Sequence, residues 1–158
     1  MLFTEFQKIA KKFVNVHSYS PVFKVASDRS LIYSDGFMLI RAIVRHAFDT
    51  DMCFNIATCT KSNVDFPNCE SIFATCKDES TREIFSILDT AKAIKPKSKK
   101  TVFIDIAGNI TAGPGINLLY ANLAHDLGCT ACYRDSSGMF HFIGVGVELW
   151  VAECNPTK

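Results

Sequence analysis

The cysteines are the first residues whose types and spacing could do chemistry. Seven are present, and Cys129 and Cys132 form the only Cys-x-x-Cys pair. A zinc site needs a second pair at matching spacing, which none of the four histidines completes. A redox pair usually lies at a helix N-terminus, where the dipole lowers the thiol pKa, whereas this pair follows a predicted helix. On a strand over 129–134 the two side chains would point to opposite faces.

We therefore expect reduced, structural cysteines, with no metal and no cofactor. A small cysteine-dependent enzyme stays open as an alternative, because a cysteine and a histidine distant in sequence meet only in the fold.

Other catalytic patterns are weak. Asp35, Asp49 and Asp51 lie close together near predicted loops, where acidic side chains are usually solvated. The segment 113–115 is Gly-Pro-Gly, but it lacks the Gly-Lys-Ser/Thr of a phosphate loop, and Pro114 removes a backbone N–H. The sequence predicts a protein that is not an enzyme.

The basic residues are concentrated in two places. Lys8, Lys11 and Lys12 fall on the polar face of a predicted N-terminal helix, and further lysines cluster over 92–100. A few lysines on one face are enough to contact nucleic-acid phosphates, but a solvated lysine face is the more common situation. Both interpretations stay open for each cluster.

Composition limits the classes of protein to consider. The 158 residues carry 17 Lys and Arg against 16 Asp and Glu, a net charge of +1, and 48% are hydrophobic. This composition excludes a disordered chain and a strongly basic nucleic-acid binder.

No apolar stretch approaches the ~20 residues that span a bilayer, and the N-terminus lacks the pattern of a signal peptide. We expect a cytoplasmic protein with no membrane contact.

Periodicity predicts the elements that must position these residues. Apolar residues recur at helical spacing over 2–15, and strand patterns follow over 22–25, 31–33, 37–44 and 52–58. Asp35-Gly36 is a turn signal between two apolar runs. Residues 66–79 are expected to have no regular secondary structure. Ser80 and Glu83 form a capping box that predicts a helix ending at Pro96.

The C-terminal third predicts a strand over 101–106, a turn at 107–109 and a helix over 116–127. Its buried stripe would hold Ile116, Leu119, Tyr120, Leu123 and Leu127, with Gly128 as the residue after the cap. Strands over 129–134, 139–143 and 146–153 have the spacing of an antiparallel meander. The whole predicts one α+β domain over 1–158, with antiparallel sheets and two to three amphipathic helices.

Three segments, in order, resemble the bacterial DNA polymerase III β subunit, the sliding clamp. They are Leu31–Leu39 with its Ser-Asp-Gly, Asp65–Phe73 with its Phe-Pro-Asn, and Gly138–Val151, which is similar to the last hairpin of the clamp. The predicted helix before the last segment stands where the second helix of a clamp domain would. Together the segments cover about half of the chain. Single-domain clamp-like proteins of this size occur among phage and prophage products.

The resemblance implies helices packed on antiparallel sheets and able to line a DNA-facing surface, so the protein is expected to be DNA-clamp-like. Its partners would be double-stranded DNA and replication proteins or the host clamp, and encirclement of DNA would need a homo-oligomer. The resemblance makes Lys8, Lys11 and Lys12 the candidates for DNA binding. The expected role is in phage or prophage DNA replication or repair, or in modulation of the host clamp. A protein–protein interaction module without DNA contact is the alternative.

Overall fold

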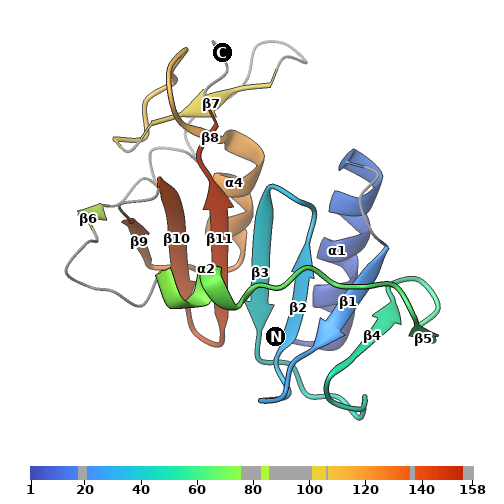
Figure 1. Ribbon diagram of the computed structural model, residues 1–158. Coiled ribbons are helices and arrows are strands. Elements are labelled where there is room, and N and C mark those ends of the chain that lie inside the picture. The colour runs from blue at the N-terminus through green and yellow to red at the C-terminus, as the bar shows by residue number, and fades with distance from the viewer. Residues whose placement is uncertain (18–20, 76–82, 86–100, 106, 136–137, 155–158) are drawn as a thin grey trace. The chain divides into compact units, whose positions relative to one another are not determined.

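The computed structural model describes residues 1–17, 21–75, 83–85, 101–105, 107–135 and 138–154 (Figure 1). The chain divides into two units, Met1–Cys69 and Glu70–Lys158. Helices and antiparallel strands make up both, so the predicted α+β class with antiparallel sheets is confirmed. One clamp-like domain over 1–158 stays a prediction.

Unit 1 consists of one helix and an antiparallel sheet in the order β5-β4-β1-β2-β3. Its elements are α1 (Phe3–His17), β1 (Val22–Val25), β2 (Leu31–Ser34), β3 (Met38–Ala42), β4 (Met52–Asn55) and β5 (Lys61–Ser62). The first helix and the first four strands confirm the predicted elements, whereas β5 lies outside the predicted strands.

Hydrogen bonds to Leu2 mark the beginning of helix α1. The Leu2 carbonyl accepts hydrogen bonds from the N–H groups of Glu5 and Phe6. The Glu5 side chain reaches back to the Leu2 N–H over 3.1 Å, as the acidic residue of a capping box does. This local bonding accounts for a helix start close to the predicted one.

Aromatic rings form the core of unit 1 beneath α1. Phe23 of β1 lies 5.8 Å from Phe6 of α1 and 5.8 Å from Phe54 of β4, measured between ring centroids. Phe48, from the segment between β3 and β4, lies 5.2 Å from Phe3 of α1. Because aromatic side chains bury a large area, this cluster holds the helix on the sheet.

The Asp35-Gly36 turn forms as predicted between β2 and β3. Gly36 has φ 93°, a conformation that costs glycine little. The Asp35 carboxylate accepts hydrogen bonds from the N–H groups of Phe37 and Met38. Asp35 is only 1% exposed, so the expectation of a solvated acid was wrong here: turn N–H groups replace the water.

Unit 2 contains a sheet in the order β6-β9-β10-β11 and a small sheet of β7 and β8. Its elements are α2 (Glu70–Thr75), β6 (Glu83–Phe85), β7 (Phe103–Ile104), β8 (Ile116–Asn117), α4 (Leu118–Asp126), β9 (Ala131–Arg134), β10 (Met139–Gly144) and β11 (Val147–Ala152). The predicted meander of β9, β10 and β11 is confirmed.

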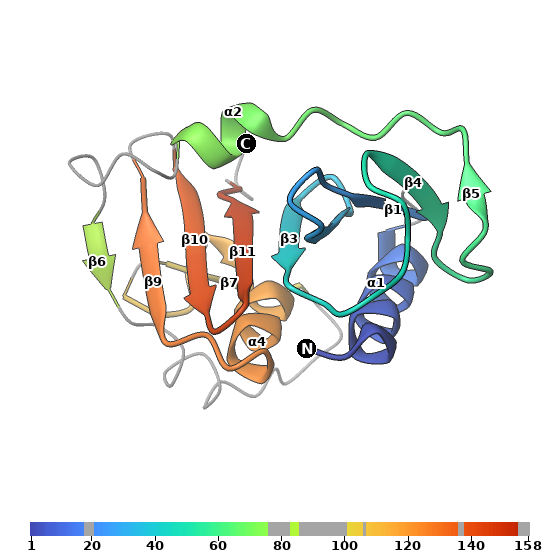
Figure 2. The same cartoon turned by 90° about the horizontal axis from the view of Figure 1, so that it is seen from below.

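Helices α2 and α4 lie against opposite faces of the sheet of unit 2, as Figures 1 and 2 both show. On the α2 face, the ring of Phe73 lies 5.0 Å from that of Trp150, which stacks on His141 at 4.5 Å. Phe142 follows His141 along β10 and therefore belongs to the α4 face. Both faces are thus packed.

Two segments of unit 2 differ from the predictions. Helix α2 lies within 66–79, which was expected to be irregular. Residues 83–85 form β6, paired with β9, so the capping box at Ser80 does not start a helix through Glu83. Sheet pairing outweighs this local signal. The rest of the predicted helix, with Ile87, Leu88 and Ala91, lies outside the described residues.

Helix α4 is shorter than predicted. Ile116 and Asn117 form a strand, and the Asn117 side chain caps the helix by accepting from the Leu119 N–H. Gly128 follows the C-cap with φ 75°, as predicted. The buried stripe holds Tyr120 and Leu123, but Leu119 is 41% exposed and Leu127 is partly exposed. The covered face of α4 instead includes Leu118, Ala121 and Ala124.

Candidate nucleic-acid interface

The exposed face of α1 carries the three lysines that the sequence singles out. Lys8, Lys11 and Lys12 are all exposed, whereas Phe6 and Phe13 on the same helix are 1% exposed. Lysines three and four positions apart lie on one side of a helix, one turn from each other. The structure therefore brings the three together, on the side of α1 that faces away from its sheet.

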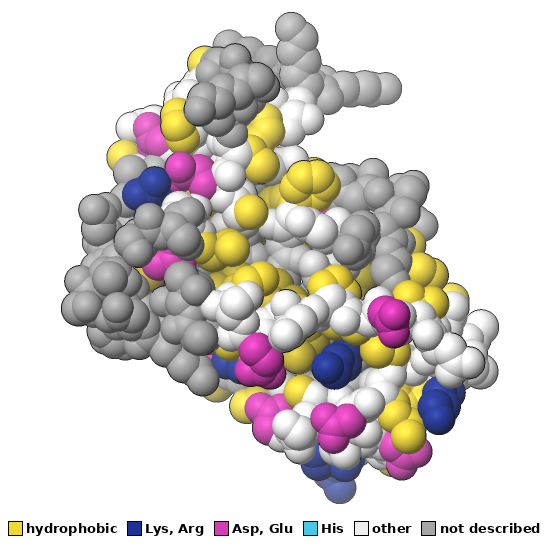
Figure 3. Space-filling model, viewed as in Figure 1, with side chains coloured by type: hydrophobic (Ala, Val, Ile, Leu, Met, Phe, Trp, Pro, Cys, Tyr) yellow, Lys and Arg dark blue, Asp and Glu magenta, His cyan; other side chains and the backbone are white. Residues whose placement is uncertain are grey.

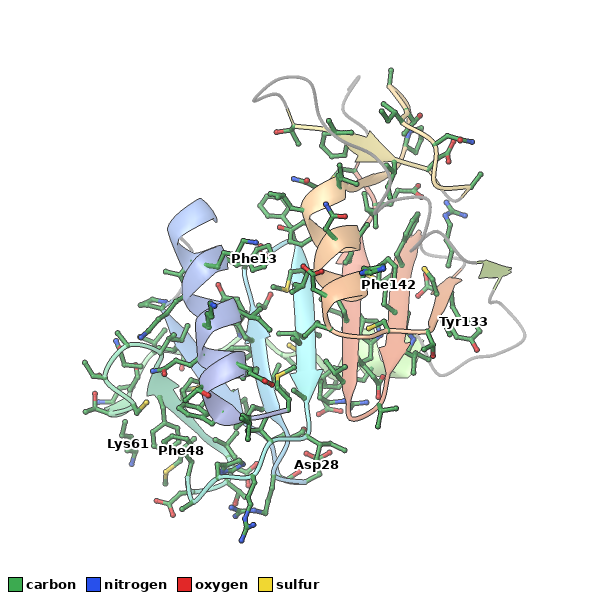
Figure 4. The ribbon with its side chains drawn as sticks, turned by 180° about the vertical axis from the view of Figure 1, so that it is seen from behind. Phe13, Asp28, Phe48, Lys61, Tyr133 and Phe142 are labelled. Atoms are coloured by element: carbon green, nitrogen blue, oxygen red, sulfur yellow. The ribbon has the colours of Figure 1, made fainter. Side chains whose placement is uncertain are left out.

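Helix α1 is fixed to unit 1 by polar as well as apolar contacts. The Gln7 side-chain amide donates to the Ile56 carbonyl over 2.6 Å. Figure 4 shows Phe13 pointing from α1 toward the strands of unit 1. A helix held along its length in this way presents its outer side chains from a fixed backbone, which suits contact with a regular partner.

The electrostatic character of this face is simple. Among the described side chains of α1, Glu5 is the single acidic residue, and its carboxylate is bonded to the Leu2 N–H at the helix start. Thr4 is the neutral neighbour one turn before Lys8. The face is therefore a small area of positive charge, in a chain whose total charge is only +1.

Helix α4 does not carry a comparable face. Its residues, Leu118–Asp126, contain no lysine or arginine. Its exposed side chains include Leu119 and Asp126, and His125 lies 3.9 Å from Asp126. A basic helix surface is thus found in unit 1 and not in α4 of unit 2.

Charge elsewhere is mixed. On the face shown in Figure 3, acidic and basic side chains of the described residues alternate, and no single sign covers a large area. The second lysine cluster, over 92–100, lies outside the described residues. Of the two predicted clusters, the lysines of α1 are thus the one that lies within the described residues.

The Cys-x-x-Cys pair is buried. Cys129 is 6% exposed and Cys132 is 0% exposed. Strand β9 begins at Ala131, after Cys129, so the predicted alternation of the two side chains along one strand does not apply. Among the described residues, no group of three or more His, Cys, Asp or Glu side chains could hold a metal, and no disulfide joins the described cysteines.

Burial makes these thiols poor nucleophiles. It raises the pKa of Cys129 to about 11, and burial together with the nearby Cys129 raises the pKa of Cys132 further. Burial also raises the pKa of the Cys53 thiol. A nucleophilic cysteine needs the opposite shift, because the thiolate is the reactive form.

The raised pKa of Cys129 predicts slow alkylation. At neutral pH, we expect Cys129 to react with iodoacetamide about 100-fold more slowly than an unhindered thiol, because its thiolate fraction is smaller by about two powers of ten. The rate should keep rising with pH up to about 11. Peptide mapping by mass spectrometry across a pH series would measure this. Rapid, complete labelling of Cys129 at pH 7 in the folded protein would contradict it.

A buried polar pair in unit 2 had no signal in the sequence. His141 of β10 is 4% exposed, and its Nε2 lies 2.9 Å from a carboxylate oxygen of Glu148 on β11. Its ring stacks on the ring of Trp150, the residue opposite it on β11. Because the ring is covered, this pair contributes to the packing of the sheet and offers no accessible site.

Comparisons of the chain with protein-family models, curated proteins and solved structures found no match. Within the described residues, no helix is both long and apolar enough to span a membrane.

Proposed function

We propose that this chain is a non-enzymatic, sliding-clamp-like protein that associates with double-stranded DNA through the lysines of α1. It would act in phage or prophage DNA replication or repair, or modulate the host clamp. The main support is the placement of Lys8, Lys11 and Lys12 on one exposed helix face whose opposite face is buried on an antiparallel sheet.

The arrangement of strands gives a second line of support. In unit 1, α1 is followed by the meander β1-β2-β3, and β4 pairs beside β1. In unit 2, α4 is followed by the meander β9-β10-β11, and β6 pairs beside β9. A helix followed by a three-stranded meander therefore occurs twice, although the fourth strand comes after the meander in unit 1 and before the helix in unit 2. A repeated helix-and-sheet arrangement agrees with the fold that the clamp resemblance implies.

The side chains on α1 favour the phosphate backbone of a duplex as the ligand. Lysine acts as a compact point charge and lacks the paired donors with which arginine reads a base edge. The amide of Gln7 is already bonded to the Ile56 carbonyl. Among the described side chains, this face carries no aromatic ring on which an unpaired base could stack. Binding would accordingly be insensitive to sequence and would prefer double strands.

Three lysines alone would bind weakly. At 0.1 M salt each phosphate contact contributes about eightfold in affinity, so three contribute on the order of 500-fold, which salt readily removes. Lasting association would therefore depend on several copies of the chain enclosing the DNA. A self-assembled ring is part of the proposal for this reason.

Helix α4 favours one alternative. Its exposed side carries Leu119 and Asp126 without a lysine, a composition that suits a protein partner better than DNA. A protein–protein interaction module without DNA contact is therefore the second candidate. For the other alternative, a small cysteine-dependent enzyme, Cys53, Cys129 and Cys132 are poor candidate nucleophiles, because burial raises the pKa of each thiol.

Fluorescence anisotropy with a short labelled duplex tests DNA association. We expect log K to fall linearly with log salt, with a slope of about −2.7 for each protomer engaged, since three contacts each contribute about −0.9. Unrelated duplex sequences should give the same affinity, and single strands a lower one. The absence of binding at about 50 mM salt would overturn the DNA proposal and favour the interaction module.

A further inference from the structure

The segment between β3 and β4 is fastened to the turn between β1 and β2 at His46. The Arg29 guanidinium donates to the His46 carbonyl over 2.9 Å. In return, Nε2 of His46 lies 2.7 Å from the Arg29 carbonyl oxygen. The other ring nitrogen, Nδ1, lies 3.1 Å from the backbone N of Phe48. Both ring nitrogens are thus engaged with backbone groups.

These partners define the protonation state of the ring. A backbone carbonyl only accepts a hydrogen bond, so Nε2 must carry a proton to bond Arg29. A backbone N–H only donates, so Nδ1 must present a lone pair to Phe48. The neutral Nε2–H tautomer is the one form of the imidazole that makes both bonds.

Phe48 connects the hydrogen bonds of His46 to the aromatic core of unit 1. Its ring lies 5.5 Å from that of His46 and 4.8 Å from that of Phe54 on β4. It also lies 5.2 Å from Phe3 at the start of α1. In Figure 4, Phe48 is seen near the N-terminal end of α1. The hydrogen bond from the Phe48 N–H to Nδ1 of His46 therefore helps to hold an aromatic residue that supports α1.

We propose that His46 is a pH-dependent clip, by which we mean a side chain whose hydrogen bonds to two chain segments depend on its protonation state. In its neutral form it joins the segment between β3 and β4 to the turn between β1 and β2; when protonated it releases the Phe48 N–H. A protonated ring has a hydrogen on both nitrogens, so Nδ1 would direct a donor at a donor. It would also add a second cation next to Arg29. The proposal is independent of DNA association.

Asp28, in the turn between β1 and β2, keeps its charge over the pH range in which a histidine is protonated. Hydrogen bonds from the Ser30 hydroxyl and N–H hold the pKa of Asp28 below its usual range, so that carboxylate keeps one charge throughout. Phe3, Phe23 and Phe54 contribute uncharged rings from α1, β1 and β4. The charged residues of the packed elements are Glu5, Lys8, Lys11 and Lys12 on α1, Lys24 on β1, Arg41 on β3, Asp28 and Arg29 in the turn, and Arg45, Asp49 and Asp51 in the segment itself.

NMR of the full-length, nitrogen-15-labelled protein tests the clip. At about pH 8, the imidazole nitrogen shifts should report the Nε2–H tautomer. Amide exchange of Phe48 is then compared with that of Leu127, whose N–H donates to the Leu123 carbonyl in unit 2. The ratio removes the general effect of pH on exchange. On acidification to about pH 5, the relative protection of Phe48 should fall about tenfold.

His46→Asn is the matched control. An asparagine oxygen accepts from the N–H two residues on and does not titrate in this range, so this variant should show a constant Phe48 to Leu127 ratio. An Nδ1–H tautomer in the wild type would overturn the proposal. So would a ratio in the wild type that does not change between the two pH values, or an equal fall in the variant.

Discussion

Replacing Lys8 and Lys11 with glutamate is expected to lower the affinity for duplex DNA by on the order of 100-fold at 0.1 M salt. Each lost phosphate contact accounts for about eightfold, and the new carboxylates add repulsion. The slope of log K against log salt should fall toward that of one remaining contact at Lys12, about −0.9. Anisotropy titrations at several salt concentrations would measure both quantities.

The control for the Lys8 and Lys11 double variant should change the net charge by the same amount at two positions outside α1. Arg45 and Lys61 are exposed residues of unit 1 outside α1. Changing both to glutamate gives the same change in net charge, and screening at 0.1 M salt limits its effect beyond about 10 Å. We expect an affinity within about threefold of the wild type. If both double variants lose affinity equally, general charge attraction explains the binding, and α1 is not the interface.

Phe23→Ala is expected to have the largest effect on stability. Phe23 is 1% exposed, and its ring lies within 5.8 Å of the rings of Phe3, Phe6, Phe48 and Phe54. Removing a buried phenylalanine costs about 3–5 kcal/mol in the free energy of unfolding, because contacts are lost and a cavity remains. The loss falls where α1 meets its sheet.

Urea unfolding followed by circular dichroism would measure this cost. The matched control is Phe37→Ala, because Phe37 is 49% exposed and should cost no more than about 1 kcal/mol. Trp150, the only tryptophan, lies in unit 2, and its fluorescence follows that unit separately. Equal losses at positions 23 and 37 would contradict the assignment of Phe23 to the centre of the core.

Elements with a strong local pattern could be predicted from the sequence. The apolar spacing of α1, the meander spacing of β9, β10 and β11 and the turn at Asp35-Gly36 each depend on residues close together in the chain. The exposure of Lys8, Lys11 and Lys12 followed from the same spacing. Gly128 after α4 was predictable because only a few residue types take a positive φ easily.

The wrong predictions concern residues whose structure depends on pairing with residues distant in the sequence. Residues 83–85 pair with β9, so these three residues are not part of the helix that Ser80 and Glu83 predict. Ile116 pairs with Ile104, so α4 starts two residues later than predicted. The bonds between His46 and Arg29 join residues 17 positions apart, and no local pattern indicates them. Long-range pairing of this kind outweighs local propensity.

Retention on circular DNA is the most direct test of a clamp-like association. The wild-type protein is assembled on a closed circular duplex, washed at about 1 M salt, where the Debye length is about 3 Å, and then the circle is cut once. The account predicts that protein stays on the closed circle through the wash and is released when the circle is linearised, in an assembly of several copies. Complete loss from the closed circle in the wash, by a protein that remains a monomer, would contradict it.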